Sequence, residues 1–182
     1  MAVNWHKVAI HEAGHVIATL DCGCLLYSCT IGTSKHSVKN SAGHVYGGTQ
    51  TIRQSAVIGI AGALSNWLHE KGRDDFNMTA FLDYFTTDSQ YANDLTDCKG
   101  YSLSDAAYEC KKILLLRWGH LERLSGKLVL PANRNREIGA AELFQMTGCR
   151  LLDSRKLPVP KRKVQIAMDR FRERGYHQWL RL

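Results

Sequence analysis

The sequence predicts an α+β fold that is mostly helical, with a small β-hairpin or sheet beside its first helix. Apolar residues recur with a helical period over much of the chain, whereas two short runs, 25–31 and 43–48, have a β-type composition. Of the 182 residues, 45% are hydrophobic and 23% are charged, which is the ordinary composition of a globular protein. A chain of this length can form one domain with a buried core and a short appendage.

The first helix is predicted over residues 3–20, where apolar side chains form a broad face, and Gly23 is expected to end it. The two β-type runs follow. The polar, turn-rich segment 32–42 between them indicates a hairpin or a small antiparallel sheet. A second helix is predicted over residues 51–72, because its pattern is helical until the terminal glycine.

Three further helices are predicted in the second half of the chain. Residues 87–90 have the form of a capping box with Thr87 as N-cap, and they predict a helix of about three turns that runs to Lys99. A longer helix is predicted over residues 104–130, before a proline. A short helix is predicted over residues 136–148, where a glycine closes it.

The chain is expected to divide into a domain of residues 1–150 and a basic tail of residues 151–182. A proline-containing linker opens the tail, and an amphipathic helix is predicted after it, over residues 164–175. The tail carries a net charge of +6 out of the chain's +7. This surplus indicates either an anionic partner such as nucleic acid, or a helix that packs back on the domain with its charges in solvent.

The composition favours a cytoplasmic protein. No apolar run approaches the ~18 residues that a membrane span needs, and no basic segment followed by an apolar one precedes residue 15. Without an export signal, the six cysteines are expected to be free thiols. The cluster of cysteines at residues 22–29 is interpreted as packing in a turn and strand rather than as a second zinc site, because it lacks a matching downstream pair.

The pattern His11-Glu12-Ala13-Gly14-His15 predicts a zinc site on the first helix. Two side chains four residues apart share a helix face, so His11 and His15 can hold one ion. Glu12 leaves that face by about a third of a turn, which suits a general base acting on a water molecule. The alternative is a pair of core histidines, but two buried imidazoles and a buried carboxylate are costly unless a charge compensates them.

The third zinc ligand must come from elsewhere, because catalytic zinc typically has three protein ligands and an open position. An extended pattern would require a histidine near position 21, where this chain has Asp21. Asp88 on the predicted capped helix and Glu109 on the long helix are the candidates that the pattern leaves open.

These features resemble the FtsH-type zinc peptidases. The resemblance rests on HEAGH at residues 11–15, on the segment IAGALSNWL at residues 60–68, and on an acidic helix start, and it extends over about residues 5–148. It implies a zincin-like domain whose third ligand is an aspartate in the first turn of a helix, with a small residue four positions later. Asp88, followed by Ala92, fits this pattern, and so does Asp94, followed by Cys98. We assign the role to Asp88, which has its own N-cap.

The sequence departs from that family in the segment 60–68 and in lacking the family's ATPase motif. Ala61 replaces a glycine, and Ser65 and Asn66 stand where acidic residues are usual, which puts the role of this segment in doubt. No Walker pattern is present in these residues, so the domain is expected to act without an ATPase module. A substrate is therefore expected to arrive unfolded, exposed or delivered by another protein.

The sequence thus predicts a zinc-dependent peptidase with Zn²⁺ as cofactor and polypeptide as substrate. Glu12 is the expected catalytic base, and the run of Gly43, His44, Val45 and Tyr46 is expected to bind substrate as an added β-strand. His44 is either an oxyanion-stabilising group or simply an exposed strand residue. The alternative functions are a zinc-stabilised, non-catalytic binding module and a nucleic-acid-associated protein.

Overall fold

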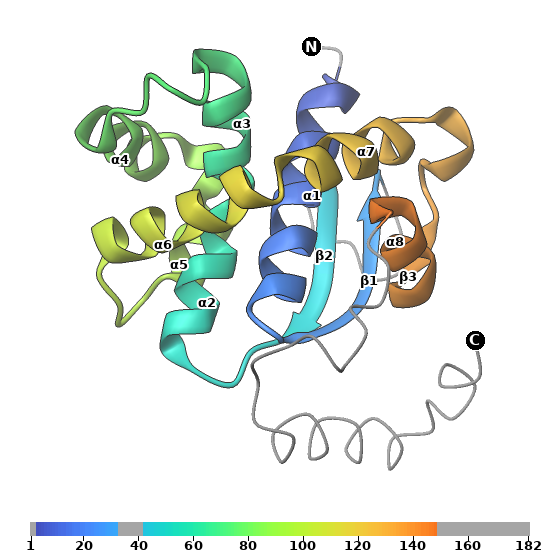
Figure 1. The fold of residues 1–182 in the computed structure, drawn as a ribbon, viewed down its shortest axis with the longest axis horizontal. Helices are drawn as coiled ribbons and strands as arrows, with labels where there is room; N and C mark the ends of the chain where they lie inside the picture. The colour runs from blue at the N-terminus through green and yellow to red at the C-terminus, as the bar shows by residue number, and fades with distance from the viewer. Residues whose placement is uncertain (1–2, 33–41, 149–182) are drawn as a thin grey trace. The chain divides into compact units, whose positions relative to one another are not determined.

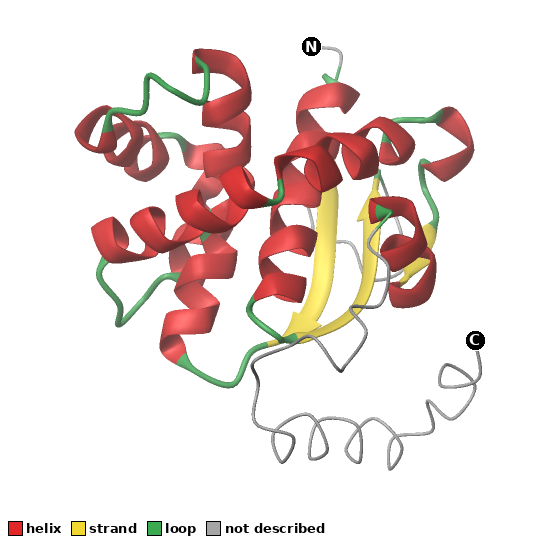
Figure 2. Cartoon of the chain, viewed as in Figure 1, coloured by secondary structure: helices red, strands yellow, loops and turns green. Residues whose placement is uncertain are grey.

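The computed structural model describes residues 3–32 and 42–148. Helices predominate in this part of the chain and the strands form one small sheet, which confirms the predicted α+β class (Figure 2). In chain order the elements are α1 (Trp5–Asp21), β1 (Leu25–Ile31), β2 (Gly43–Gly48), α2 (Ile52–Gly59), α3 (Ala61–Lys71), α4 (Met78–Thr87), the 3₁₀ turn η1 (Ser89–Tyr91), α5 (Ala92–Asp97), α6 (Leu103–Leu116), α7 (Trp118–Leu128), η2 (Pro131–Asn133), β3 (Glu137–Gly139) and α8 (Ala140–Thr147).

The sheet is antiparallel with the strand order β2–β1–β3, so the predicted pair of strands is present and gains a third. Leu25 pairs with Gly48 and Ile31 with Gly43, and the register shifts at Tyr27. Helix α1 packs against β1 and β2 and is covered by α3 and α7 (Figure 1). The helix that carries the histidines is therefore the central element of the described fold.

Local sequence explains where α1 begins and why it can lie so deep. The side chain of Asn4 caps its first turn by accepting a hydrogen bond from the backbone N–H of Lys7, and Gly23, with a φ of 65°, follows its end. Gly14 permits close contact with α3, because a Cβ at this position would lie 2.2 Å from Ser65 Oγ and 2.6 Å from Ala61 O. Helix α1 thus matches the predicted helix closely.

Two of the predicted helices are interrupted in the structure. The helix expected over residues 51–72 is divided at Ile60 into α2 and α3, where Gly59 packs against the backbone of α5 and Ile58 O accepts a hydrogen bond from His15. The helix expected over residues 104–130 is divided at Arg117 into α6 and α7. The Arg117 side chain is held by Asp21 at 2.9 Å, so the break lies where the chain is tied to the end of α1.

The helix predicted from Thr87 to Lys99 is wrong in its start. Thr87 is the last residue of α4, and its hydroxyl donates to Asp83 O at 2.7 Å within that helix. The chain then turns at Asp88 into η1, and α5 begins only at Ala92. Helix α4 itself had no counterpart in the sequence prediction.

The short helix predicted over residues 136–148 consists of β3 followed by α8, and Gly148 closes it in the left-handed conformation with a φ of 69°. The buried side chains of the described core come from residues between Ala9 and Thr147. Within the described ranges, no helix combines the length and the apolar character that crossing a membrane would require. The predicted tail, residues 151–182 with its helix, lies outside the described residues.

Candidate metal centre

His11 and His15 meet on one face of α1, as their spacing predicts. Their Nε2 atoms lie 3.0 Å apart, and both side chains are largely buried. The Nδ1 atom of His15 lies 2.7 Å from Ile58 O, and because a carbonyl can only accept, Nδ1 must carry the proton. The Nε2 atom of a neutral His15 therefore keeps its lone pair, which is the arrangement of a histidine that ligates a metal.

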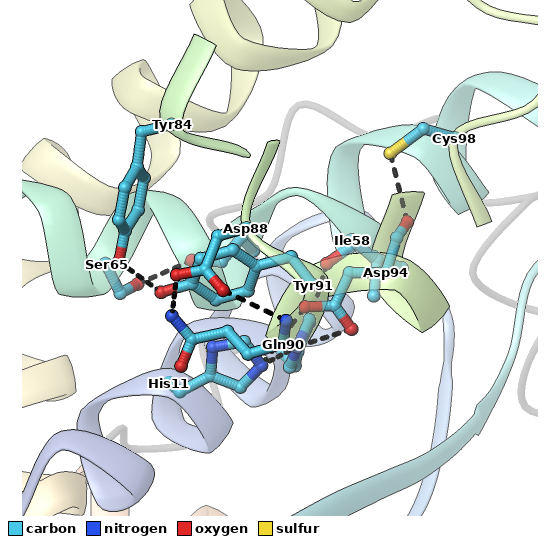
Figure 3. Close-up of polar contacts among 11 residues, drawn as sticks. His11, Ile58, Ser65, Tyr84, Asp88, Gln90, Tyr91, Asp94 and Cys98 are labelled. Carbon is cyan, nitrogen blue, oxygen red and sulfur yellow. Dashed lines mark hydrogen bonds and ion pairs between the residues drawn. The ribbon is translucent and has the colours of Figure 1, made fainter. Parts of the chain in front are cut away.

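Asp94 is the carboxylate that joins the two histidines. Its Oδ2 atom lies 3.2 Å from His11 Nε2 (Figure 3). Its Oδ1 atom lies 3.8 Å from His15 Nε2. The three residues each offer a ligand atom, and these atoms all lie within 4.8 Å of one another. Among the described residues, no other group of three histidine, cysteine or acidic side chains is brought together in this way.

The geometry corrects the assignment of the third ligand to Asp88. The Asp88 carboxylate accepts hydrogen bonds from the backbone and side chain of Gln90, so it caps η1 instead (Figure 3). Asp94 lies in the first turn of α5 and Cys98 follows four residues later, donating to Asp94 O at 3.3 Å. Glu109, the other candidate, is engaged with Arg53 at the surface.

Glu12 lies beside this group but contributes no atom to it. Its side chain is 5% exposed, and its Oε2 atom is buried without a hydrogen-bond partner. The strand β2 leaves room for the carboxylate only because residue 43 is glycine: a Cβ at Gly43 would lie 2.5 Å from Glu12 Oε1. Burial raises the pKa of Glu12 to about 7, while His11 acts to lower it and Asp94 to raise it.

The pKa values of His15, His11 and Asp94 are also shifted, and the shifts show which of these groups are charged when no metal is bound. Burial lowers the pKa of His15 to about 4, against the attraction of Asp94. Burial alone would also lower the pKa of His11, but the carboxylates of Asp94 and Glu12 together raise it. Burial would raise the pKa of Asp94, but His11 and His15 together lower it. One ion pair, His11 with Asp94, is thus stabilised, whereas Glu12 has no counter-charge of its own.

A divalent cation fits the residues present. The buried Oδ2 atom of Asp94 forms an ion pair with His11 Nε2 at 3.2 Å, and both residues offer a ligand atom to the group. Two carboxylates, those of Asp94 and Glu12, stand beside two imidazoles, of which burial keeps His15 neutral, and a divalent cation would balance the charge of the carboxylates. Two nitrogens and one carboxylate oxygen are the ligand set of a catalytic zinc ion.

Two residues that the sequence analysis did not single out shape the ligand group. A Cβ at Gly62 of α3 would lie 2.5 Å from both His11 Cε1 and His15 Nε2, so the imidazoles pack directly on this helix. On the other side, the Tyr91 ring stacks on the His11 ring, with centroids 5.7 Å apart and planes 15° apart. Gly62 lies within the segment 60–68 on which the resemblance rests, and this was the available signal for it, whereas no sequence pattern marked Tyr91.

The positions where the FtsH-type pattern has acids are occupied here by buried neutral groups. Ser65 donates to Ala61 O at 2.8 Å, and Asn66 is 3% exposed. The second segment therefore packs against α1 through small and neutral side chains.

A cavity of about 470 Å³ opens beside the ligand group, and residues of α1, β2, α2 and α5 line it. The cavity lining includes Gly43, His44 and Val45, three of the four residues predicted to bind substrate. The fourth, Tyr46, is not part of the lining. Tyr46 is 50% exposed and its ring lies 5.1 Å from that of Tyr27. His44 is close enough to the ligand group to lower the pKa values of His15 and Asp94.

Comparison of the chain with protein-family models returned no match, and comparison with curated protein sequences returned none either. The resemblance to the FtsH-type peptidases therefore rests on the residues at 11–15 and 60–68 and on the acidic helix start.

Proposed function

We propose that the chain is a zinc-dependent peptidase of the HExxH type that hydrolyses peptide bonds in unstructured or exposed polypeptide segments. The observation that carries this proposal is the position of Glu12. Its buried, unpartnered Oε2 atom adjoins three converging ligand atoms in the wall of a cavity about 470 Å³ in volume. A carboxylate held in this way is suited to moving a proton beside a cation.

The ligands in this proposal are His11, His15 and Asp94. A bound zinc ion would supply Lewis acidity, which polarises a peptide carbonyl and acidifies a water molecule at neutral pH. His15 presents Nε2 because Ile58 O holds its proton on Nδ1. We assign to Glu12 the transfer of a proton at Oε2, first from the attacking water and then to the leaving amine.

The substrate is proposed to lie along β2 as an added strand. Gly43, His44 and Val45 of β2 form part of the cavity lining, so an extended segment in the cavity would lie alongside this strand. Gly43 begins β2 beside Glu12, which would bring the backbone of such a substrate to the base. Because this mode uses main-chain hydrogen bonds, a chain must be extended to bind, and folded proteins are excluded.

A non-catalytic module in which zinc only stabilises the fold is the competing function. The cavity beside the ligand group argues against it, because a structural zinc site is closed by a fourth protein ligand. A nucleic-acid partner was predicted from residues 151–182, which lie outside the described part, so it has no support from the site. We also propose a cytoplasmic location, with which the free thiols of the five described cysteines are compatible.

The test compares purified wild type with Glu12→Gln, both loaded with zinc. Elemental analysis is expected to give about one zinc per chain in both proteins, since Glu12 is not a ligand. An unstructured casein-type substrate should be cleaved by the wild type without nucleotide, and Glu12→Gln should be slower by a factor of about 10² or more. A compact folded protein should remain intact. Equal cleavage by the two proteins would refute the role of Glu12, and zinc binding without any cleavage would favour the non-catalytic module.

A further inference from the structure

The two histidines of the ligand group are held in place by different means. His15 donates from Nδ1 to Ile58 O at 2.7 Å, so one hydrogen bond fixes both the tautomer and the orientation of its ring. Within residues 3–32 and 42–148, Nδ1 of His11 has no such acceptor, and the polar contacts of this ring are those of Nε2 with His15 and Asp94. The plane of the His11 imidazole must therefore be set by the groups packed against it.

The ring of Tyr91 is the group that lies flat against this imidazole. The planes of the Tyr91 and His11 rings are 15° apart and their centroids are 5.7 Å apart. Helix α3 approaches the same imidazole at Gly62, where a Cβ would lie 2.5 Å from His11 Cε1 and 2.6 Å from His11 Nε2. The imidazole is thus confined by α3 as well as by Tyr91, and it cannot tilt without displacing one of them.

Tyr91 is itself fixed from two helices. Its side chain is 1% exposed, and its hydroxyl is hydrogen-bonded to the hydroxyl of Tyr84 on α4 (Figure 3). The side-chain amide of Asn66 on α3, which is also buried, donates to the same Tyr91 hydroxyl. The Tyr91 ring further contacts the rings of Tyr84 and Phe85, with centroids 5.2 Å and 6.0 Å away. A ring held in this way can impose an orientation on its neighbour.

The same residue begins the helix that carries Asp94. Tyr91 is the N-cap of α5, and Asp94 follows three residues later in the first turn, a spacing that places two side chains on the same side of a helix. Both side chains contact His11, Tyr91 with its ring and Asp94 with Oδ2, which lies 3.2 Å from Nε2. Tyr91 therefore connects two members of the ligand group that are far apart in the sequence.

We propose that Tyr91 is the positioning residue of the ligand group, whose ring holds the plane of the His11 imidazole and whose place at the start of α5 sets Asp94 against it. The role rests on the proposed function, which supplies the metal, but it does not require hydrolysis. Tyr91 acts through the two ligands and contributes no ligand atom of its own.

The experiment compares wild type with Tyr91→Leu, which removes the ring, and with Tyr91→Phe, which keeps the ring and removes the hydroxyl. Zinc affinity is measured by chelator competition, and the geometry of the centre by the visible absorption of the cobalt(II)-substituted proteins. Tyr91→Leu should bind zinc about 10- to 100-fold more weakly, which is the usual effect of losing a residue that orients a ligand. Its cobalt spectrum should change, whereas Tyr91→Phe should keep the zinc affinity and the cobalt spectrum of wild type.

Phe81→Leu is the matched control for the loss of a buried aromatic ring. Phe81 lies on α4 and is fully buried, and its ring contacts those of Trp67 and Phe85. Among the ring contacts of the described residues, none joins Phe81 to Tyr91 or to His11. Urea unfolding should show that Phe81→Leu and Tyr91→Leu both lose stability. Phe81→Leu should nevertheless keep the zinc affinity and the cobalt spectrum of wild type.

The outcomes separate this inference from the proposed function. An equal loss of zinc affinity in Tyr91→Leu and Phe81→Leu, or an unchanged cobalt spectrum in Tyr91→Leu, overturns the inference, because Tyr91 would then serve only stability. A loss in Tyr91→Phe as large as in Tyr91→Leu also overturns it, since the hydroxyl and not the ring would be responsible. A wild type that binds neither zinc nor cobalt overturns the metal centre and the inference together. The expected metal affinities without hydrolysis of any polypeptide would overturn the peptidase alone.

Discussion

Replacement of Gly62 by alanine tests whether close packing of α3 on the imidazoles sets the geometry of the proposed metal centre. The new Cβ would lie 2.5 Å from His11 Cε1 and from His15 Nε2, and 2.6 Å from His11 Nε2. Ordinary carbon contacts are about 3.5–4.0 Å, so each imidazole or the helix must move by roughly 1 Å. Zinc–nitrogen distances tolerate only about ±0.2 Å around 2.0–2.1 Å. We therefore expect zinc affinity to fall by at least about tenfold.

The stability of the metal-free protein gives a second measurement of the same overlap. Glycine to alanine in a helix interior stabilises by about 0.8–1 kcal/mol, whereas overpacking of this kind costs about 1–3 kcal/mol. Gly62→Ala should therefore be between neutral and about 2 kcal/mol less stable in urea unfolding. Gly126→Ala is the matched control, because it lies in α7 with nothing within 4 Å of its Cβ, and it should gain stability without changing zinc binding. Equal behaviour of the two variants in chelator titration and in urea would refute the steric argument.

The remaining predictions concern the carboxylates. In parallel chelator titrations Asp94→Asn should weaken zinc retention by about 10² or more, whereas Asp88→Asn should change it by no more than about threefold; the reverse order would return the third ligand to Asp88. The raised pKa of Glu12 means that the native metal-free protein binds a proton that the unfolded chain releases between pH 4.5 and about 7. Across this window rising pH should remove up to about 3 kcal/mol of stability in wild type relative to Glu12→Gln. Urea unfolding of both metal-free proteins at several pH values measures the difference, and parallel pH profiles would contradict it.

The strongest local signals in the sequence correspond to the best-predicted parts of the structure. The pattern of α1 combined a long apolar face, two histidines in phase and a terminating glycine, and these features depend only on neighbours along the chain. The strands β1 and β2 were equally predictable, because β-type residues flanked a polar, turn-rich segment. The approach of His11 to His15 followed from helix geometry alone.

The breaks in the predicted helices could not be read in the same way, because tertiary contacts decide them. Ile60 has backbone angles close to those of a helix, with a φ of −79° and a ψ of −14°. What divides α2 from α3 is the packing of Gly59 on α5 and the bond from His15 to Ile58 O, both of which join segments far apart in sequence. Likewise, the break between α6 and α7 lies at Arg117, whose side chain contacts Asp21, 96 residues away in the sequence.

The position of Asp94 as the third member of the ligand group was hard to predict from the sequence for a related reason. Helix α5 has six residues, and none of them is buried, so neither its apolar pattern nor its intrinsic helicity marks it. It is fixed at its two ends instead, by Tyr91 and Cys98, which are 1% and 2% exposed. Asp94 is thus carried by a short helix whose position depends on its anchors, opposite a long helix that is fixed by the core. A cation bound by His11, His15 and Asp94 would join these two elements directly. A bound zinc ion would therefore order α5 against α1, and its removal would loosen the part of the cavity wall that α5 forms.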